Sequence, residues 1–169
     1  MKYILILLMC IIPCHGRDAE LKITDKFIRA VAMLESGGVK NPNQAVGDNG
    51  KSNGAYQIQS AAWDDCNRRL RKQGKPTTSY RDGVNHPQIS KMYCRIYLEI
   101  VRDSLLKVMP RDVMYVDVYC AYNMGVLGYL RACGEYKTDK QGKQRLVGVR
   151  PDKHPHQHQL SKLIDAMRK

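Results

Sequence analysis

The segment from Asp112 to Tyr122 carries apolar or aromatic side chains almost all the way around a helical projection. These residues are Val113, Tyr115, Val116, Val118, Tyr119, Cys120 and Tyr122. A helix without a broad polar face has to be surrounded by other parts of the chain. We therefore predict a buried central helix that begins at Asp112 and around which the rest of the fold packs.

Several amphipathic segments can surround that helix. Apolar residues recur at helical spacing over residues 24–36, 60–73, 87–109, 126–133 and 160–167. Residues 39–54 instead contain turn-forming pairs such as Asn53-Gly54, and residues 55–59 read as a short strand. No alternation typical of a parallel sheet is present. The pattern predicts a mainly α domain with a small loop and short-strand segment, and 169 residues suffice for one buried core.

The N-terminal residues read as an export signal. Lys2 precedes an uncharged apolar run from Ile4 to Ile12 that is too short to span a bilayer, and Gly16 fits a cleavage site. We expect residues 1–16 to be removed, residues 17–134 to form the main domain, and residues 135–169 to form a basic extension with a C-terminal helix. The protein is then secreted or periplasmic, without a transmembrane segment.

Four cysteines remain after such cleavage, namely Cys66, Cys94, Cys120 and Cys133. Their even number in an exported protein favours two disulfide bonds, and no Cys-x-x-Cys pair suggests zinc. Three pairings remain open. The three histidines within residues 154–158 are interpreted as part of a solvated linker rather than as metal ligands. We expect neither a metal nor a cofactor.

The formal net charge is +12, from 28 lysines and arginines against 16 acidic residues. This balance favours an anionic partner such as a bacterial wall, an acidic polysaccharide, a membrane surface or nucleic acid. No segment interleaves arginine with aromatic residues as a base-stacking surface does, so nucleic acid is the weakest candidate. We expect a monomer that binds an anionic bacterial surface.

Glu35 is the most informative acidic residue. It follows Ile28 and Val31 at helical spacing, so its carboxyl group projects along the apolar side of the first predicted helix. Desolvation and the negative end of the helix dipole both favour the protonated acid there. Cleavage of a glycosidic bond needs a neutral carboxylic acid to protonate the leaving oxygen. On its own, however, the position favours a glutamate at a solvated helix end over a catalytic acid.

Three short motifs occur in a fixed order along the chain. They are Glu35-Ser36-Gly37-Gly38, then the stretch from Gly47 to Ile58 with Gly54-Ala55-Tyr56-Gln57-Ile58, and finally Ala121-Tyr122-Asn123-Met124-Gly125. Over residues 24–134 this order resembles the lysozyme-like superfamily, in particular soluble lytic transglycosylases and goose-type lysozymes. The resemblance implies an α+β lysozyme-like catalytic domain whose loop and short-strand segment forms one wall of a glycan cleft.

The same resemblance implies a substrate and a set of site residues. The substrate is peptidoglycan or a related glycan such as chitin, and the bond is the β-1,4 link between N-acetylmuramic acid and N-acetylglucosamine. In that family the glutamate closing the first helix is the catalytic acid, which corresponds to Glu35, and Ser36 helps hold the next loop. Four further residues fall in cleft-lining segments, namely Tyr56, Gln57, Tyr122 and Asn123.

Whether a second carboxylate takes part determines which of two reaction routes follows proton transfer from Glu35. Residues 54–58 and 62–66 also resemble the invertebrate-type lysozymes, in which a second carboxylate follows the catalytic glutamate, and Asp48 is the matching candidate. If Asp48 acts on water, the products carry ordinary reducing ends; if the substrate's own hydroxyl attacks, they are 1,6-anhydro sugars. The first and third motifs resemble the transglycosylases most closely, which favours the second route. The alternative function is a non-catalytic cationic protein that binds glycans or bacterial surfaces.

Overall fold

The computed structural model describes residues 21–37, 39–150, 153 and 157–168, so the predicted export signal and the histidines at positions 154 and 156 lie outside it. The described chain is mainly helical with two small antiparallel sheets, which confirms the predicted fold class. In chain order the elements are α1 (Asp25–Ser36), η1 (Pro42–Gln44), β1 (Val46–Gly47), η2 (Asp48–Gly50), β2 (Ser52–Asn53), β3 (Ile58–Gln59), α2 (Ser60–Lys72), α3 (Tyr80–Gly83), α4 (Pro87–Val108), α5 (Tyr115–Met124), α6 (Val126–Cys133), β4 (Gly134–Thr138), β5 (Gln144–Val149) and α7 (Gln157–Arg168).

Helix α5 is the predicted central helix. Its residues from Val118 to Ala121 are fully buried, and it packs on α4 and α6. It begins at Tyr115 rather than at Asp112, because the buried carboxylate of Asp117 accepts a hydrogen bond from the backbone N–H of Met114 at 2.8 Å. The same carboxylate accepts one from the Tyr129 hydroxyl on α6 at 2.6 Å. Asp117 therefore fixes the start of α5 and ties α6 to it.

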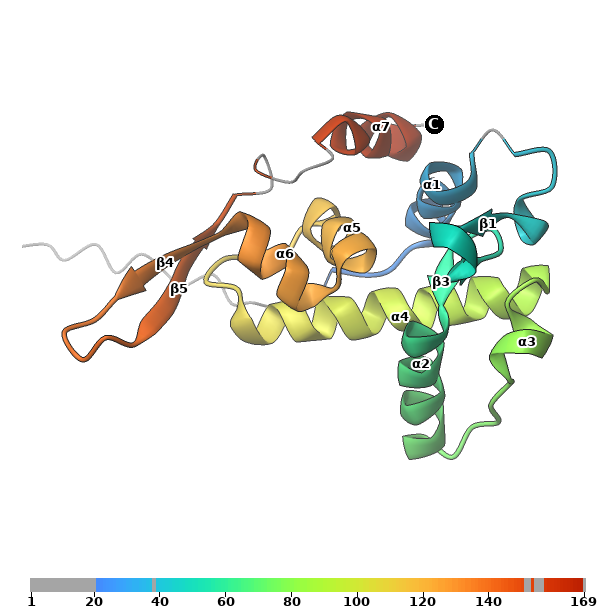
Figure 1. The fold of residues 1–169 in the computed structure, drawn as a ribbon, viewed down its shortest axis with the longest axis horizontal. Helices are drawn as coiled ribbons and strands as arrows, with labels where there is room; N and C mark the ends of the chain where they lie inside the picture. Colours follow the sequence, from blue (N-terminus) through green and yellow to red (C-terminus); the bar gives the residue numbers. More distant parts are fainter. Residues whose placement is uncertain (1–20, 38, 151–152, 154–156, 169) are drawn as a thin grey trace, which may run out of the picture.

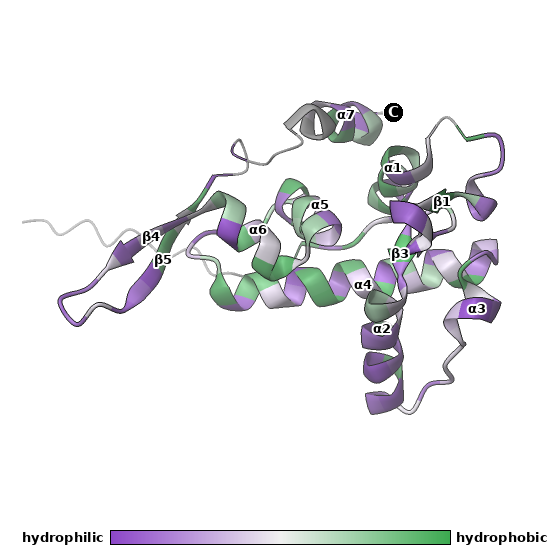
Figure 2. Ribbon diagram, viewed as in Figure 1, coloured by the Kyte–Doolittle hydropathy of each residue, from purple (hydrophilic) through white to green (hydrophobic). Residues whose placement is uncertain are grey.

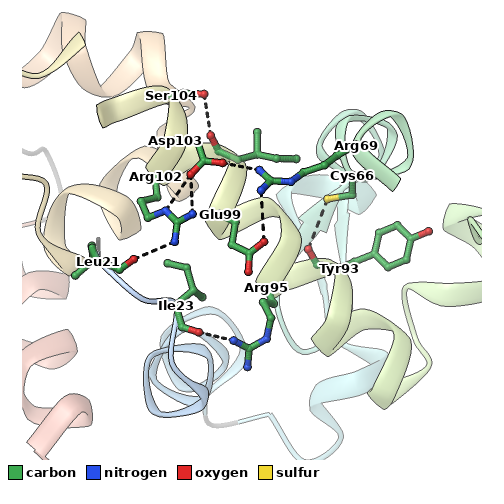
Figure 3. Close-up of polar contacts among 11 residues, drawn as sticks. Leu21, Ile23, Cys66, Arg69, Tyr93, Arg95, Glu99, Arg102, Asp103 and Ser104 are labelled. Carbon is green, nitrogen blue, oxygen red and sulfur yellow. Dashed lines mark hydrogen bonds and ion pairs between the residues drawn. The ribbon is translucent and has the colours of Figure 1, made fainter. Parts of the chain in front are cut away.

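Helix α4 has 22 residues and runs along the molecule, with α1, α5, α6 and α7 above it and α2 and α3 below it in the view of Figure 1. Figure 3 shows the guanidinium groups of Arg95 and Arg102 donating to the backbone carbonyls of Ile23 and Leu21, just before α1. On α2, Trp63 stacks on Tyr93 of α4 with 3.7 Å between ring centroids. These contacts attach both α1 and α2 to one rigid helix.

A small sheet joins α1 to α2, with the strand order β1-β2-β3. The strand predicted over residues 55–59 is confined to Ile58–Gln59, because residues 54–57 form a turn. Gly54 and Gln57 adopt positive φ values of 76° and 47° in that turn. The loop predicted over residues 39–54 contains the other two strands and two 3₁₀ turns.

The C-terminal part of the chain contains the predicted C-terminal helix, α7, and a hairpin that the sequence did not predict. The hairpin, strands β4 and β5, projects from one end of the molecule, and α7 lies along α1 (Figure 1). Val149 of the hairpin and Leu163 of α7 both belong to the buried core, with Leu163 only 2% exposed. The C-terminal part of the chain is thus anchored to the main domain. Within the described ranges, no helix has both the length and the apolar character needed to cross a membrane.

Candidate active site

A cleft of about 530 Å³ opens between the small sheet and the helices. Its walls come from the end of α1, the loop and strands of residues 47–59, the first turns of α2, the middle of α4 and the end of α5. Of the residues predicted to act on a glycan, the cleft brings together Glu35, Asp48, Gln57, Tyr122 and Asn123. Segments separated by almost 90 positions in the chain therefore meet at one cavity.

Glu35 lies in the last turn of α1 and faces this cleft. Its Oε1 atom is shielded from solvent and has no hydrogen-bond partner among the described residues. A buried polar atom without a partner costs free energy unless a ligand or a proton satisfies it. The carboxyl group is therefore set up to be neutral or to contact a substrate atom.

The electrostatic surroundings of Glu35 favour the neutral form. The pKa of Glu35 is raised to about 6, chiefly by burial and also by the charge of Asp48, whereas hydrogen bonds from Tyr119 and Asn123 act in the opposite direction. A general acid works best when its pKa lies near the working pH. The desolvation of Glu35 is thus of the kind that glycosidic cleavage requires.

Asp48 also lines the cleft, at the start of η2. Its backbone is left-handed, with φ at 49°, which is uncommon for a residue with a side chain. Its Oδ2 atom accepts hydrogen bonds from Ser52 Oγ at 3.1 Å and from Gln59 Nε2 at 3.3 Å. The loop therefore holds an exposed carboxylate in a defined position in the same cleft as Glu35.

Gln57 holds this loop rather than presenting its amide to a ligand. Its Nε2 donates to the carbonyl of Gly54 at 2.8 Å and to that of Ala45 at 3.3 Å, while its Oε1 accepts from Ser52 at 3.0 Å. A Cβ atom on Gly47 would lie only 2.2 Å from Gln57 Oε1, so Gly47 leaves the room that the amide occupies. Gln57 thus supports, through Ser52, the loop that carries Asp48, and its expected contact with sugar stays a prediction.

Tyr56 and Tyr122 form a buried support under the cleft. The Tyr122 hydroxyl donates to the backbone carbonyl of Tyr56 at 2.5 Å, and burial raises the pKa of Tyr56 to about 12. The Tyr56 ring belongs to the core, which differs from its expected contact with substrate, because the turn at residues 54–57 directs it inward. Ser36 joins α1 to this turn by donating to the Ala55 carbonyl at 2.8 Å.

Three cleft residues were missed by the sequence reading. Tyr97 of α4 is half-buried, lines the cleft and packs edge-to-face on Tyr122, with 5.4 Å between ring centroids. Ser52 and Gln59 line the cleft beside Asp48. No motif in the sequence surrounds Tyr97, and its position in the cleft follows from the packing of α4 against α5. A partly exposed aromatic ring in such a cleft can stack on a sugar face.

The four cysteines are buried thiols that lie in two neighbourhoods. The thiol of Cys66 donates to the backbone carbonyl of Tyr93 at 3.5 Å (Figure 3). Cys94 follows Tyr93 in the chain and interacts electrostatically with Cys66. Cys120 and Cys133 lie on the packed helices α5 and α6 and interact electrostatically. Burial raises the pKa of both Cys66 and Cys120 to about 12. The two disulfide bonds stay a prediction. Of the three possible pairings, this arrangement favours Cys66 with Cys94 and Cys120 with Cys133.

Comparisons with protein-family models, with curated proteins and with solved structures found no match to this chain. The chemistry of the cleft therefore has to be argued from its residues. In the part of the chain that the structure describes, no group of three or more His, Cys, Asp or Glu side chains is arranged to hold a metal ion. The cleft offers a shielded carboxylic acid, a second carboxylate and a partly exposed aromatic side chain. This set suits acid-catalysed cleavage of a glycosidic bond.

Proposed function

We propose that the protein is a secreted glycosidase that cleaves the β-1,4 backbone of peptidoglycan, with Glu35 as the general acid. The observation that carries this proposal is the shielded, unpartnered Oε1 of Glu35 in a cleft that also contains Asp48. The raised pKa of about 6 keeps a large share of Glu35 protonated in mildly acidic solution. The resemblance to lysozyme-like enzymes supplies the substrate class.

In the proposed reaction the Glu35 carboxyl group gives its proton to the glycosidic oxygen as the bond to the sugar C1 breaks. The sugar develops oxocarbenium character, and the leaving chain departs with a new hydroxyl group. The charge left on Glu35 is then stabilised by the hydrogen bonds from Tyr119 and Asn123. These two donors favour the ionised product state, while burial favours the protonated starting state.

The fate of the oxocarbenium-like sugar depends on Asp48. Its carboxylate is held by Ser52 and Gln59 in an exposed position in the cleft, where it can orient water or stabilise positive charge at C1. Such a dedicated hydrogen-bonding arrangement is not needed if the substrate's own hydroxyl attacks. We therefore favour the hydrolytic route, whereas the sequence motifs alone favoured the transglycosylase route.

Substitution of the acid tests the proposal. Glu35→Gln keeps the shape of the side chain but cannot supply the proton, so lysis of purified peptidoglycan is expected to fall by at least about 100-fold. Glu99→Gln is the matched control, because Glu99 lies on α4 outside the residues that line the cleft and forms only a 3.7 Å ion pair with Arg69. It should retain wild-type activity. Lysis by Glu35→Gln at the wild-type rate would show that the assigned acid is wrong.

The same assay separates catalysis from binding alone. A cationic glycan-binding protein without turnover would bind cell walls in a salt-sensitive way and release no fragments, and it would do so whether residue 35 is Glu or Gln. Release of soluble muropeptides by the wild type alone is therefore the outcome that the proposal requires.

A further inference from the structure

The β4–β5 hairpin has two unlike faces. On one face Tyr136 and Leu146 are directly opposite each other, and the Tyr136 hydroxyl donates to the Leu130 carbonyl at the end of α6, at 3.2 Å. Both side chains approach Gly134, where a Cβ atom would lie 2.8 Å from the Tyr136 ring and 3.0 Å from Leu146. This face therefore rests on the body of the protein, and the alternation of side chains along a strand directs the next pair away from it.

That outward pair is Lys137 and Arg145, which are cross-strand partners. Lys143 precedes β5 in the turn, two positions before Arg145, and Asp139 holds its backbone there. All three side chains are exposed, and in the described part of the chain no carboxylate forms an ion pair with any of them. We call Lys137, Lys143 and Arg145 the cationic face of the hairpin.

The two carboxylates of the hairpin are already engaged elsewhere. Asp139 closes the turn, since its Oδ1 accepts from the backbone N–H of Lys143 at 2.8 Å and from that of Gln141 at 3.0 Å. Glu135 lies at the base, within 3.8 Å of Arg150 and 3.7 Å of Lys153. Neither acid neutralises the cationic face.

Like charges directly opposite each other across two strands are destabilising. Lys137 and Arg145 carry this cost in a hairpin whose turn and base are otherwise well ordered by hydrogen bonds. A bound polyanion would remove the repulsion, and an arginine flanked by lysines is well suited to phosphate groups. Figure 2 shows the hairpin tip in hydrophilic colours, so the tip lacks the apolar surface needed to enter a bilayer.

We propose that the cationic face of the hairpin binds a flexible linear phosphate polymer, in which successive phosphate groups contact Lys137, Arg145 and Lys143. No aromatic residue shares this outward face to stack on bases, which favours a polymer that is recognised through its phosphates alone. The hairpin projects from one end of the molecule, away from strands β1 and β3, whose segment lines the cleft (Figure 1). The inference is therefore independent of the proposed function, and a polymer on the hairpin leaves the cleft open.

The experiment measures binding of the full mature chain to fluorescein-labelled inorganic polyphosphate and to a labelled poly(glycerol phosphate) chain by anisotropy. The double variant Lys137→Gln/Arg145→Gln should weaken binding at least about tenfold. It should also flatten the dependence of log Kd on log salt by about 1.4–1.8, the contribution of two phosphate contacts. The tighter of the two polymers identifies the source of the phosphate chemistry.

Lys72→Gln/Lys75→Gln is the matched control, since it removes the same charge from exposed lysines at the end of α2. Its Kd should stay within about twofold of the wild type. Equal weakening by both double variants would overturn the proposal, because net charge alone would then explain binding. Tighter, hairpin-dependent binding to anionic vesicles or to duplex DNA than to either polymer would also overturn it.

Lysis of peptidoglycan that carries no phosphate polymer keeps the two proposals apart. The hairpin variant should cleave it at the wild-type rate. Loss of polymer binding with intact cleavage concerns the hairpin alone, and a protein that binds polymer but never cleaves would contradict only the proposed function.

Discussion

Replacing Glu35 by Gln should make the protein more stable at neutral pH. Below pH 4.5 the carboxyl group is protonated in both the folded and the unfolded chain, so it has no net effect on stability. Between pH 4.5 and about 6 the folded chain keeps the proton while the unfolded chain releases it, and stability therefore falls as the pH rises. Above that range the cost of ionising Glu35 in the cleft is fully present.

A pKa raised from 4.5 to about 6 corresponds to roughly 2 kcal/mol. Glu35→Gln removes this cost, so its gain in the free energy of unfolding should grow from near zero at about pH 4 to roughly 2 kcal/mol at pH 7. The assay is urea unfolding followed by the fluorescence of Trp63, the single tryptophan, which is fully buried against Tyr93. Glu99→Gln, the control, should lose up to about 1 kcal/mol at pH 7 instead.

The difference between wild type and Glu35→Gln is the decisive quantity. A difference that stays constant from pH 4 to pH 7 would refute the reasoning, because Glu35 would then titrate alike in the folded and unfolded chains. A stabilised but inactive variant would show that the protein gives up stability to keep an acid in its cleft.

Three further predictions follow from the packing and the loop. In protein exported to an oxidising compartment, peptide mapping should find Cys66 linked to Cys94 and Cys120 linked to Cys133; any other pairing would contradict the two observed neighbourhoods. Leu163→Ala should cost about 2–4 kcal/mol in urea unfolding because Leu163 is 2% exposed, whereas Ile164→Ala, at a position 50% exposed, should cost less than about 1 kcal/mol. Asp48→Asn should keep the left-handed loop, which asparagine tolerates, yet lose most lytic activity; a variant that retains it would assign Asp48 to the turn alone.

Local sequence patterns predicted the helices well. Thr24 caps α1 through its side chain at 3.2 Å from the Phe27 N–H, and Pro87 opens α4, as their positions in the sequence indicate. The burial of α5 followed from its apolar residues on nearly every side. The start of that helix was misplaced, because Asp117 caps it by accepting from the Met114 backbone N–H. The contacts of Arg111 and Tyr129 that hold this carboxylate are not revealed by the linear sequence.

The cleft was only partly predictable. Residue type and motif indicated Glu35 and Asp48, whereas Tyr97 lines the cleft because of the packing of α4 against α5. Gln57 and Tyr56 were expected to contact sugar, and the structure uses the Gln57 amide in the loop and the Tyr56 ring in the core. The hairpin of residues 134–149 was missed because its exposed polar strands resemble a solvated extension, and the hydrogen bond from Tyr136 to the Leu130 carbonyl that ties it to α6 is not visible in the sequence.

The most direct test of the central claim is mass analysis of the fragments that the purified protein releases from peptidoglycan in ¹⁸O-labelled water. The account predicts disaccharide-containing muropeptides whose new reducing ends carry one ¹⁸O atom, released by the wild type and absent with Glu35→Gln. Unlabelled 1,6-anhydro products would retain Glu35 as the acid but contradict the role assigned to Asp48. If the wild type releases no glycan fragments under any tested pH, the protein is not the glycosidase proposed here.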